Sequence, residues 1–106
     1  MSGFAGIFCR DGATPDLAIL DQMASRIAFR GPDAKQISVC PGAGVAFTLL
    51  RTGPAPQAET QPVLLDGRWW LAGDVRLDGR AELERKLQVA AAFKKGAADE
   101  ELALMA

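Results

Sequence analysis

The stretch Met1-Ser2-Gly3-Phe4-Ala5-Gly6-Ile7-Phe8-Cys9 decides how the rest of the chain is interpreted. Its apolar residues, interrupted by two glycines and followed by the turn sequence Asp11-Gly12, predict a short buried strand that carries the amino terminus into the fold. A hydrolase can use a residue held in this way as its nucleophile, with the freed α-amine of the same residue as the base. Ser2 is therefore the first candidate catalytic residue.

The composition is that of one globular domain or part of one. The chain has 106 residues, of which 49% are hydrophobic and 24% charged. A net charge of −1 gives no basic footprint for nucleic acid or a membrane surface. The absence of histidine excludes serine–histidine and cysteine–histidine catalysis within the chain and removes the commonest metal ligand, so no metal site is expected.

Cysteine usage and hydropathy indicate a cytoplasmic protein. Cys9 and Cys40 have neither the spacing of a zinc site nor that of a disulfide framework, so we expect two free thiols in a reducing compartment. The sequence contains no signal-peptide pattern and no apolar run long enough to span a membrane.

Periodicity predicts an α+β chain. A helix starts at Thr14-Pro15-Asp16, with Thr14 as its cap, and ends before Gly31-Pro32. Alternating patterns predict two hairpins, the second around Asp66-Gly67, and two further helices close the chain. The expected ranges are 35–40 with 45–50, 62–65 with 68–75, 81–93 with Asp78 as cap, and 100–106. Because the last helix is so short, the chain is expected to end inside a larger domain.

Glycine and charge occur together at three predicted strand or helix ends. These are Ser2-Gly3, Arg30-Gly31-Pro32-Asp33 and Ala72-Gly73-Asp74, and Arg51 ends a fourth element. An arginine there can bind a substrate carboxylate through two hydrogen bonds. Each also has a purely structural interpretation, as a helix terminus, a turn, a bulge or a solvated side chain.

The order of these pieces resembles the amino-terminal glutamine amidotransferase domain of the asparagine synthetase family. The family opens Met-Cys-Gly-Ile-x-Gly, has His-Arg-Gly-Pro-Asp after a helix, and has Asn-Gly-Glu after a later strand. The corresponding stretches here are Met1–Gly6, Phe29–Asp33 and Ala72–Asp74. The family also has a strand that ends in arginine, a loop closed by Gln-Pro, a helix with Glu-Leu, and Ser-Asp-x-Glu at the start of a helix. These features are matched by Arg51, Gln61-Pro62, Glu82-Leu83 and Ala98-Asp99-Glu100-Glu101.

The resemblance implies a four-layer αββα sandwich of the N-terminal nucleophile hydrolase type, with antiparallel sheets and flanking helices. Residues 1–106 would form the N-terminal part of that domain. In the family, residue 2 attacks the amide of glutamine, and the ammonia travels to an ATP-using synthetase domain. That domain, with its ATP and Mg²⁺, is absent from this sequence and is the expected partner; no cofactor is expected in the chain itself.

The catalytic positions depart from the family. Ser2 stands where the family has cysteine, and Ala72 replaces the oxyanion asparagine, while Gly73 keeps a backbone N–H. A serine hydroxyl needs a base, and loss of one oxyanion donor lowers a rate on the order of 10²–10³-fold. If Met1 stays attached, Ser2 has no free α-amine to act as that base.

The positions that bind substrate in the family match this sequence better than the catalytic positions do. Arg51 and Asp99 match the family residues that hold the carboxylate and the amine of glutamine, and Asp74 replaces a glutamate. The turn Arg30-Gly31-Pro32-Asp33 matches the structural motif. A peptide or amino-acid substrate is therefore the expected ligand.

Three hypotheses follow. In the first, the chain belongs to a degenerate amidotransferase-like domain of an ATP-dependent, amide-forming enzyme without glutaminase activity. Residues 73–80 are similar to the branch with β-lactam synthetase and lasso-peptide macrolactam cyclases, where an amine of the substrate itself attacks. In the second, Ser2 is an active nucleophile of a glutamine-hydrolysing asparagine synthase. In the third, the chain is a non-catalytic α+β interaction module. Homo-oligomerisation is open in all three.

Overall fold

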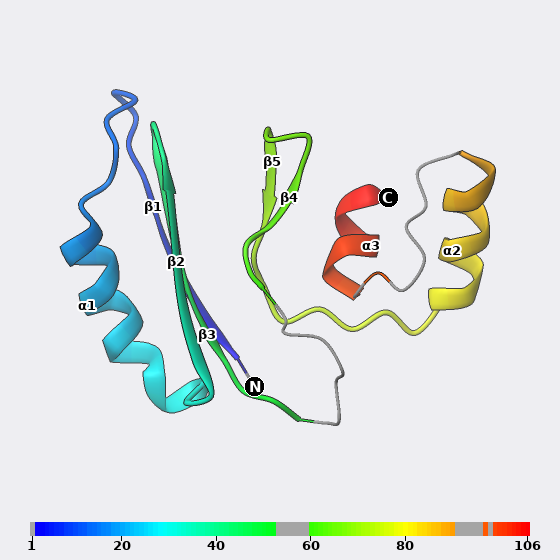
Figure 1. Ribbon diagram of the computed structural model, residues 1–106, viewed down its shortest axis with the longest axis horizontal. Coiled ribbons are helices and arrows are strands. Elements are labelled where there is room, and N and C mark those ends of the chain that lie inside the picture. Colours follow the sequence, from blue (N-terminus) through cyan, green and yellow to red (C-terminus); the bar gives the residue numbers. More distant parts are fainter. Residues whose placement is uncertain (1, 53–59, 91–96, 98) are drawn as a thin grey trace.

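The computed structural model describes residues 2–52, 60–90, 97 and 99–106. The chain is α+β, and both of its sheets are antiparallel, as predicted (Figure 1). The elements in chain order are β1 (Gly3–Phe8), α1 (Leu17–Ile27), the 3₁₀ turn η1 (Ala28–Arg30), β2 (Ala34–Cys40), β3 (Ala43–Leu49), β4 (Val63–Leu65), β5 (Trp69–Leu71), α2 (Arg80–Val89) and α3 (Asp99–Met105).

A three-stranded sheet and a two-stranded sheet lie between the helices. The strand order is β1-β3-β2 in the larger sheet, and β4 pairs with β5 in the smaller. From left to right, Figure 1 shows α1, the larger sheet, the β4–β5 hairpin, and then α3 and α2. Leu20 and Ala24 of α1 pack on Ala46 of β3 to form one apolar cluster, while Leu87, Ala97 and Leu102 form a second around α2 and α3.

Both predicted hairpins are confirmed, because their turns are determined locally. Gly42 joins β2 to β3 with φ of +89°, and Asp66 and Gly67 join β4 to β5 with φ of +53° and +65°. These are left-handed conformations that glycine and aspartate adopt more readily than other residues. The strand predicted at 68–75 is shorter than expected and comprises only Trp69–Leu71. Beyond it, Gly73 bonds to a side chain instead of to β4.

The cap of α1 differs from the prediction. Asp16, and not Thr14, occupies the N-cap, where its Oδ1 accepts a hydrogen bond of 2.8 Å from the backbone N–H of Ala18. Pro15 is buried and precedes the helix. The helical path ends as predicted, since α1 passes into η1 and stops before Gly31.

We expect Asp16→Ala to destabilise the protein by about 1 kcal/mol, because it removes the oxygen that accepts from a helix N-terminal N–H. Thr14→Ala is the matched control and should change the free energy of unfolding by less than about 0.5 kcal/mol. Urea denaturation of both variants measures this. A loss confined to Thr14→Ala would show that the cap is assigned to the wrong residue.

The prediction that Asp78 caps α2 is also wrong. Gly79 occupies the N-cap without any side-chain hydrogen bond, and Asp78 instead forms an exposed ion pair of 3.2 Å with Arg76. The helix ends at Val89, so it is shorter than the predicted range 81–93. Residues 91–93, the last part of the predicted range, lie outside the described residues.

The opening strand is not buried as predicted. β1 forms an edge of its sheet, and Phe4 and Phe8 are 57% and 78% exposed. Gly3, Ala5 and Ile7 share the face that meets α1, because side chains alternate along a strand. Apolar composition predicted burial on both faces, whereas only this face is well covered.

Candidate functional site

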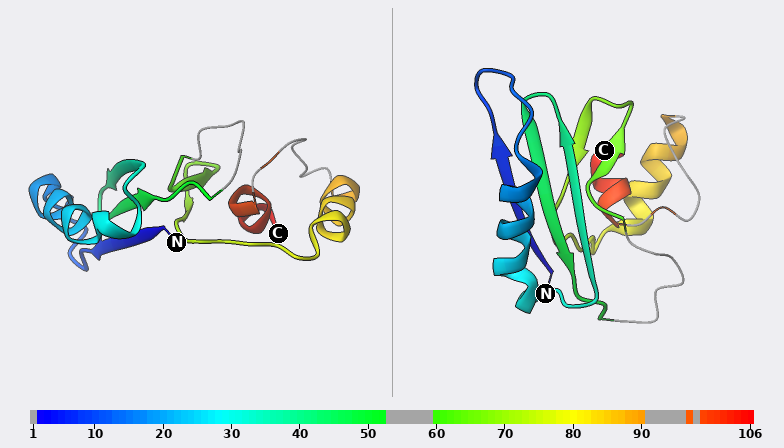
Figure 2. Two further views of the ribbon diagram at one scale, coloured as in Figure 1. Left: turned by 90° about the horizontal axis from the view of Figure 1, so that it is seen from below. Right: turned by 60° about the vertical axis from the view of Figure 1, so that its left-hand side comes forward.

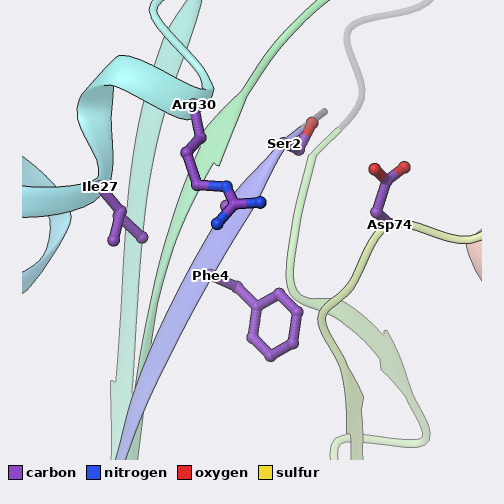
Figure 3. Close-up of a pocket in the computed structure, with 6 residues that line it drawn as sticks. Ser2, Phe4, Ile27, Arg30 and Asp74 are labelled. Carbon is purple, nitrogen blue, oxygen red and sulfur yellow. The ribbon is translucent and has the colours of Figure 1, made fainter.

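A cavity of about 440 Å³ opens beside the start of β1. It is lined by residues from three separate segments: Ser2, Gly3, Phe4, Ile27, Arg30 and Asp74. Figure 3 shows the Arg30 guanidinium and the Asp74 carboxylate on different sides of Ser2, with the ring of Phe4 below them. The fold thus brings together three residues that the sequence singled out from distant positions.

Ser2 is hydrogen-bonded to the residue that follows β3, the central strand of the larger sheet. Its Oγ accepts a hydrogen bond of 3.1 Å from the backbone N–H of Leu50. A hydroxyl has one donor and two acceptor positions, so this bond leaves its proton available. The contact fixes the side chain at the cavity, where it can meet a ligand.

The turn Arg30-Gly31-Pro32-Asp33 locks the end of η1 onto β3. The backbone N–H of Asp33 donates to the carbonyl of Leu49 at 2.9 Å, and its Oδ2 accepts from the backbone N–H of Arg51 at 2.7 Å. Buried Gly31 lies directly on Thr48, where a Cβ would come within 2.3 Å of backbone atoms. These contacts position Arg30 at the cavity.

Thr48 of β3 connects two of the segments that line the cavity. It is fully buried, and its Oγ1 lies 3.3 Å from the carbonyl oxygens of both Gly3 and Ile27, between which its one proton is shared. The start of β1 and the end of α1, which both line the cavity, are therefore joined through one hydroxyl.

Gln61 is the main polar residue whose role the sequence did not indicate. It is only 4% exposed, and its side-chain amide pairs with both backbone groups of Gly73: Nε2 donates to the carbonyl at 2.8 Å, and Oε1 accepts from the N–H at 2.8 Å. Its backbone N–H donates to Gln36 Oε1 of β2 at 2.6 Å, and Nε2 also lies 3.4 Å from Glu100 Oε1.

This pairing has a direct chemical consequence for Ala72 and Gly73, the two positions expected from the resemblance to match an oxyanion site. The Gly73 N–H points at Gln61 and is already engaged, and the neighbouring Ala72 has no side-chain donor. A primary amide is the side chain that can both donate to the C=O and accept from the N–H of one residue. That property was the only signal of this role in the sequence, where Gln61-Pro62 counted only as one of the stretches that match the family.

Asp99 and Arg51 do not line this cavity. The Asp99 carboxylate accepts from Arg80 Nη1 at 2.6 Å and from the Leu77 N–H at 3.0 Å. Arg80 also donates to the carbonyl of Ala97. Asp99 thus fastens the start of α3 to the segment before α2. The structure brings Ser2, Arg30 and Asp74 together at the cavity, while Arg51 directly follows Leu50, whose backbone N–H bonds to Ser2.

Neither a metal cluster nor a membrane span is present in the part of the chain that the structure describes. Over those residues, no group of three or more His, Cys, Asp or Glu side chains is arranged to hold a metal ion. None of the described helices has both the length and the apolar character needed to cross a membrane. Cys9 and Cys40 are free thiols, as expected.

Comparison with known proteins gives no assignment. No family model matches the chain, and no curated protein or solved structure is significantly similar to it.

Proposed function

We propose that the chain is an amidotransferase-like domain that has lost glutaminase activity and serves an ATP-dependent, amide- or lactam-forming enzyme. The observation that carries this proposal is the bonding of Gly73, which with Ala72 matches the oxyanion positions of the family that the chain resembles. Ser2, which matches the nucleophile position of that family, lines the cavity, while Gln61 engages the Gly73 N–H and Ala72 offers no donor.

Attack of a hydroxyl on an amide carbonyl places negative charge on the carbonyl oxygen. Hydrolases stabilise this charge with donors about 2.7–3.1 Å from it. For Gly73 to serve, its 2.8 Å bond to Gln61 Oε1 would have to break inside a buried network. That costs free energy at the moment when the transition state needs stabilisation, so hydrolysis at Ser2 is disfavoured.

The arrangement of elements supports the fold part of the proposal. The order helix, sheet, sheet, helix in Figure 1 is compatible with the N-terminal part of an αββα sandwich. In the proposed enzyme, a synthetase domain activates a carboxylate of a peptide or amino-acid substrate with ATP. An amine of the substrate then forms the new bond, so no ammonia is required.

The cavity suggests a residual role for its charged residues. Arg30 and Asp74 carry opposite charges at one cavity and come from two separate segments, the end of η1 and the stretch after β5. Such a pair suits a ligand that carries both an anionic and a cationic group, as an amino acid or a peptide end does. We propose substrate holding, not hydrolysis, as the function of this site.

The test is whether glutamine contributes nitrogen to the product. In the protein that carries this chain together with its synthetase domain, glutamine labelled with ¹⁵N at the amide should transfer no label to the new amide bond. Ammonia release from glutamine should stay at background. Labelled product would contradict the proposal.

A second candidate is hydrolysis by Ser2 as an N-terminal nucleophile. It is favoured by one observation, the position of the Ser2 hydroxyl at the cavity beside Arg30 and Asp74. If residue 2 became the first residue, its α-amine would be available as a base at the same place. The two candidate functions make different predictions for a chain that begins at Ser2. Only the second predicts that this chain releases ammonia from glutamine.

A further inference from the structure

We infer that two copies of this chain associate through the free edge of β1, in an antiparallel pair centred on Gly6. β1 pairs with β3 alone, so its other edge has no strand partner among the described residues. Figure 2 shows β1 at the border of the sheet, with no other element drawn along its outer side. This inference does not rest on the proposed function.

The backbone groups of β1 that face outward follow from its register. The N–H of Cys9 donates to Gly42 on the β3 side at 2.8 Å, and N–H directions alternate along a strand. The N–H groups of Gly3, Ala5 and Ile7 therefore point toward β3. Those of Phe4, Gly6 and Phe8 point away from the sheet and are available to a second strand.

The pattern of β1 is self-complementary in one register. With Gly6 opposite Gly6 of the second copy, Phe4 lies opposite Phe8 of that copy, and the reverse. All of these are outward-facing positions, so each is a hydrogen-bonded pair of an antiparallel ladder. The two phenylalanines, 57% and 78% exposed in the single chain, would form two aromatic cross-strand pairs on one face.

Charge favours a second copy of the same chain as the occupant. No residue from Gly3 to Cys9 is charged, and the whole chain has a net charge of only −1, so self-pairing meets little repulsion. Monomeric proteins usually protect an edge strand with lysine, proline or a bulge. β1 contains neither lysine nor proline, and its register with β3 is continuous.

Gly6 allows a sharp test. A Cβ at this exposed position would meet only ordinary contacts, the nearest at 3.4 Å from the carbonyl oxygen of Gly44, so the single chain should tolerate a side chain there. In the proposed dimer, Gly6→Lys and Gly6→Glu each place like charges opposite one another. We expect each to weaken dimerisation by about fivefold or more, while an equimolar mixture restores it as a heterodimer.

Sedimentation velocity over a dilution series measures this on the full 106-residue chain. Val89→Lys, at an exposed position of α2, is the control for added charge and should leave dimerisation unchanged. A monomeric wild type at all concentrations would overturn the inference. So would variants that still dimerise singly, or a mixture that fails to recover.

Amide hydrogen exchange on the unmodified chain gives a second measurement that needs no variant. The amides of Phe4, Gly6 and Phe8 should be protected at high protein concentration and should exchange faster on dilution. The amides of Ala5 and Ile7, which face β3, should be protected at both. Protection that is independent of concentration at Phe4, Gly6 and Phe8 would contradict the proposed pairing.

Discussion

Gly31→Ala should destabilise the fold by about 3 kcal/mol or more, at the upper end of the range for forcing atoms into a packed interior. A Cβ at this position would lie 2.3 Å from both the carbonyl carbon and the carbonyl oxygen of Thr48, and 2.5 Å from the Leu49 nitrogen. All three are backbone atoms of the central strand, so they cannot move aside as a flexible side chain would. The turn would have to separate from β3, and Arg30 would leave the cavity with it.

The expected loss of stability in Gly31→Ala has a steric cause, and a substitution at a second glycine serves as the control. Gly31 has φ of −145°, a conformation open to any residue, so the loss would not come from backbone strain. At Gly79 an added Cβ meets nothing within 4 Å. Gly79→Ala should therefore change the free energy of unfolding by no more than about 1 kcal/mol. Equal losses in the two variants, measured by urea denaturation, would show that Gly31 is not in close contact with β3.

Gln61→Met should cost about 2–4 kcal/mol, because it leaves two buried backbone groups of Gly73 without partners. Methionine is similar in length and flexible, so the space remains filled while both hydrogen bonds are lost. The contact between Nε2 and Glu100 is lost as well. We also expect faster hydrogen exchange at the Gly73 amide, since its acceptor is gone.

The control for this substitution is Gln88→Met, at an exposed position of α2. It should change the free energy of unfolding by less than about 0.5 kcal/mol. If Gln61→Met proved equally mild, or if the Gly73 amide kept its protection, Gln61 would not be the partner of Gly73. The explanation given for the missing oxyanion donor would then fail too.

Local features were predictable from the sequence. Asp66-Gly67 determines its hairpin because both residues readily adopt the left-handed conformation that the turn requires. Gly31-Pro32 ends the helical path because proline cannot continue it. The cap of α1 was missed because Thr14 and Asp16 are both good caps, and local preference does not distinguish them.

The other differences depend on contacts between distant residues. Whether β1 is central or at an edge depends on which strands pair, and six apolar residues are compatible with either. Asp99 matched a substrate position, yet its carboxylate is engaged by Arg80, nineteen positions away in the chain. The role of Gln61 depends on Gly73, which reaches it only because the chain returns after β5. Periodicity carries no information on such pairings.

The claim that the Ser2 cavity has lost its hydrolytic activity is tested most directly by ammonia release from glutamine. The chain should be prepared with Ser2 as its first residue, so that the α-amine is free, and compared with the same chain carrying Ser2→Ala. A third sample that retains Met1 controls for the free amine. We expect all three to release ammonia at the same background rate. Glutamine-dependent ammonia from the chain beginning at Ser2, abolished by Ser2→Ala or by retention of Met1, would contradict the proposed loss of activity.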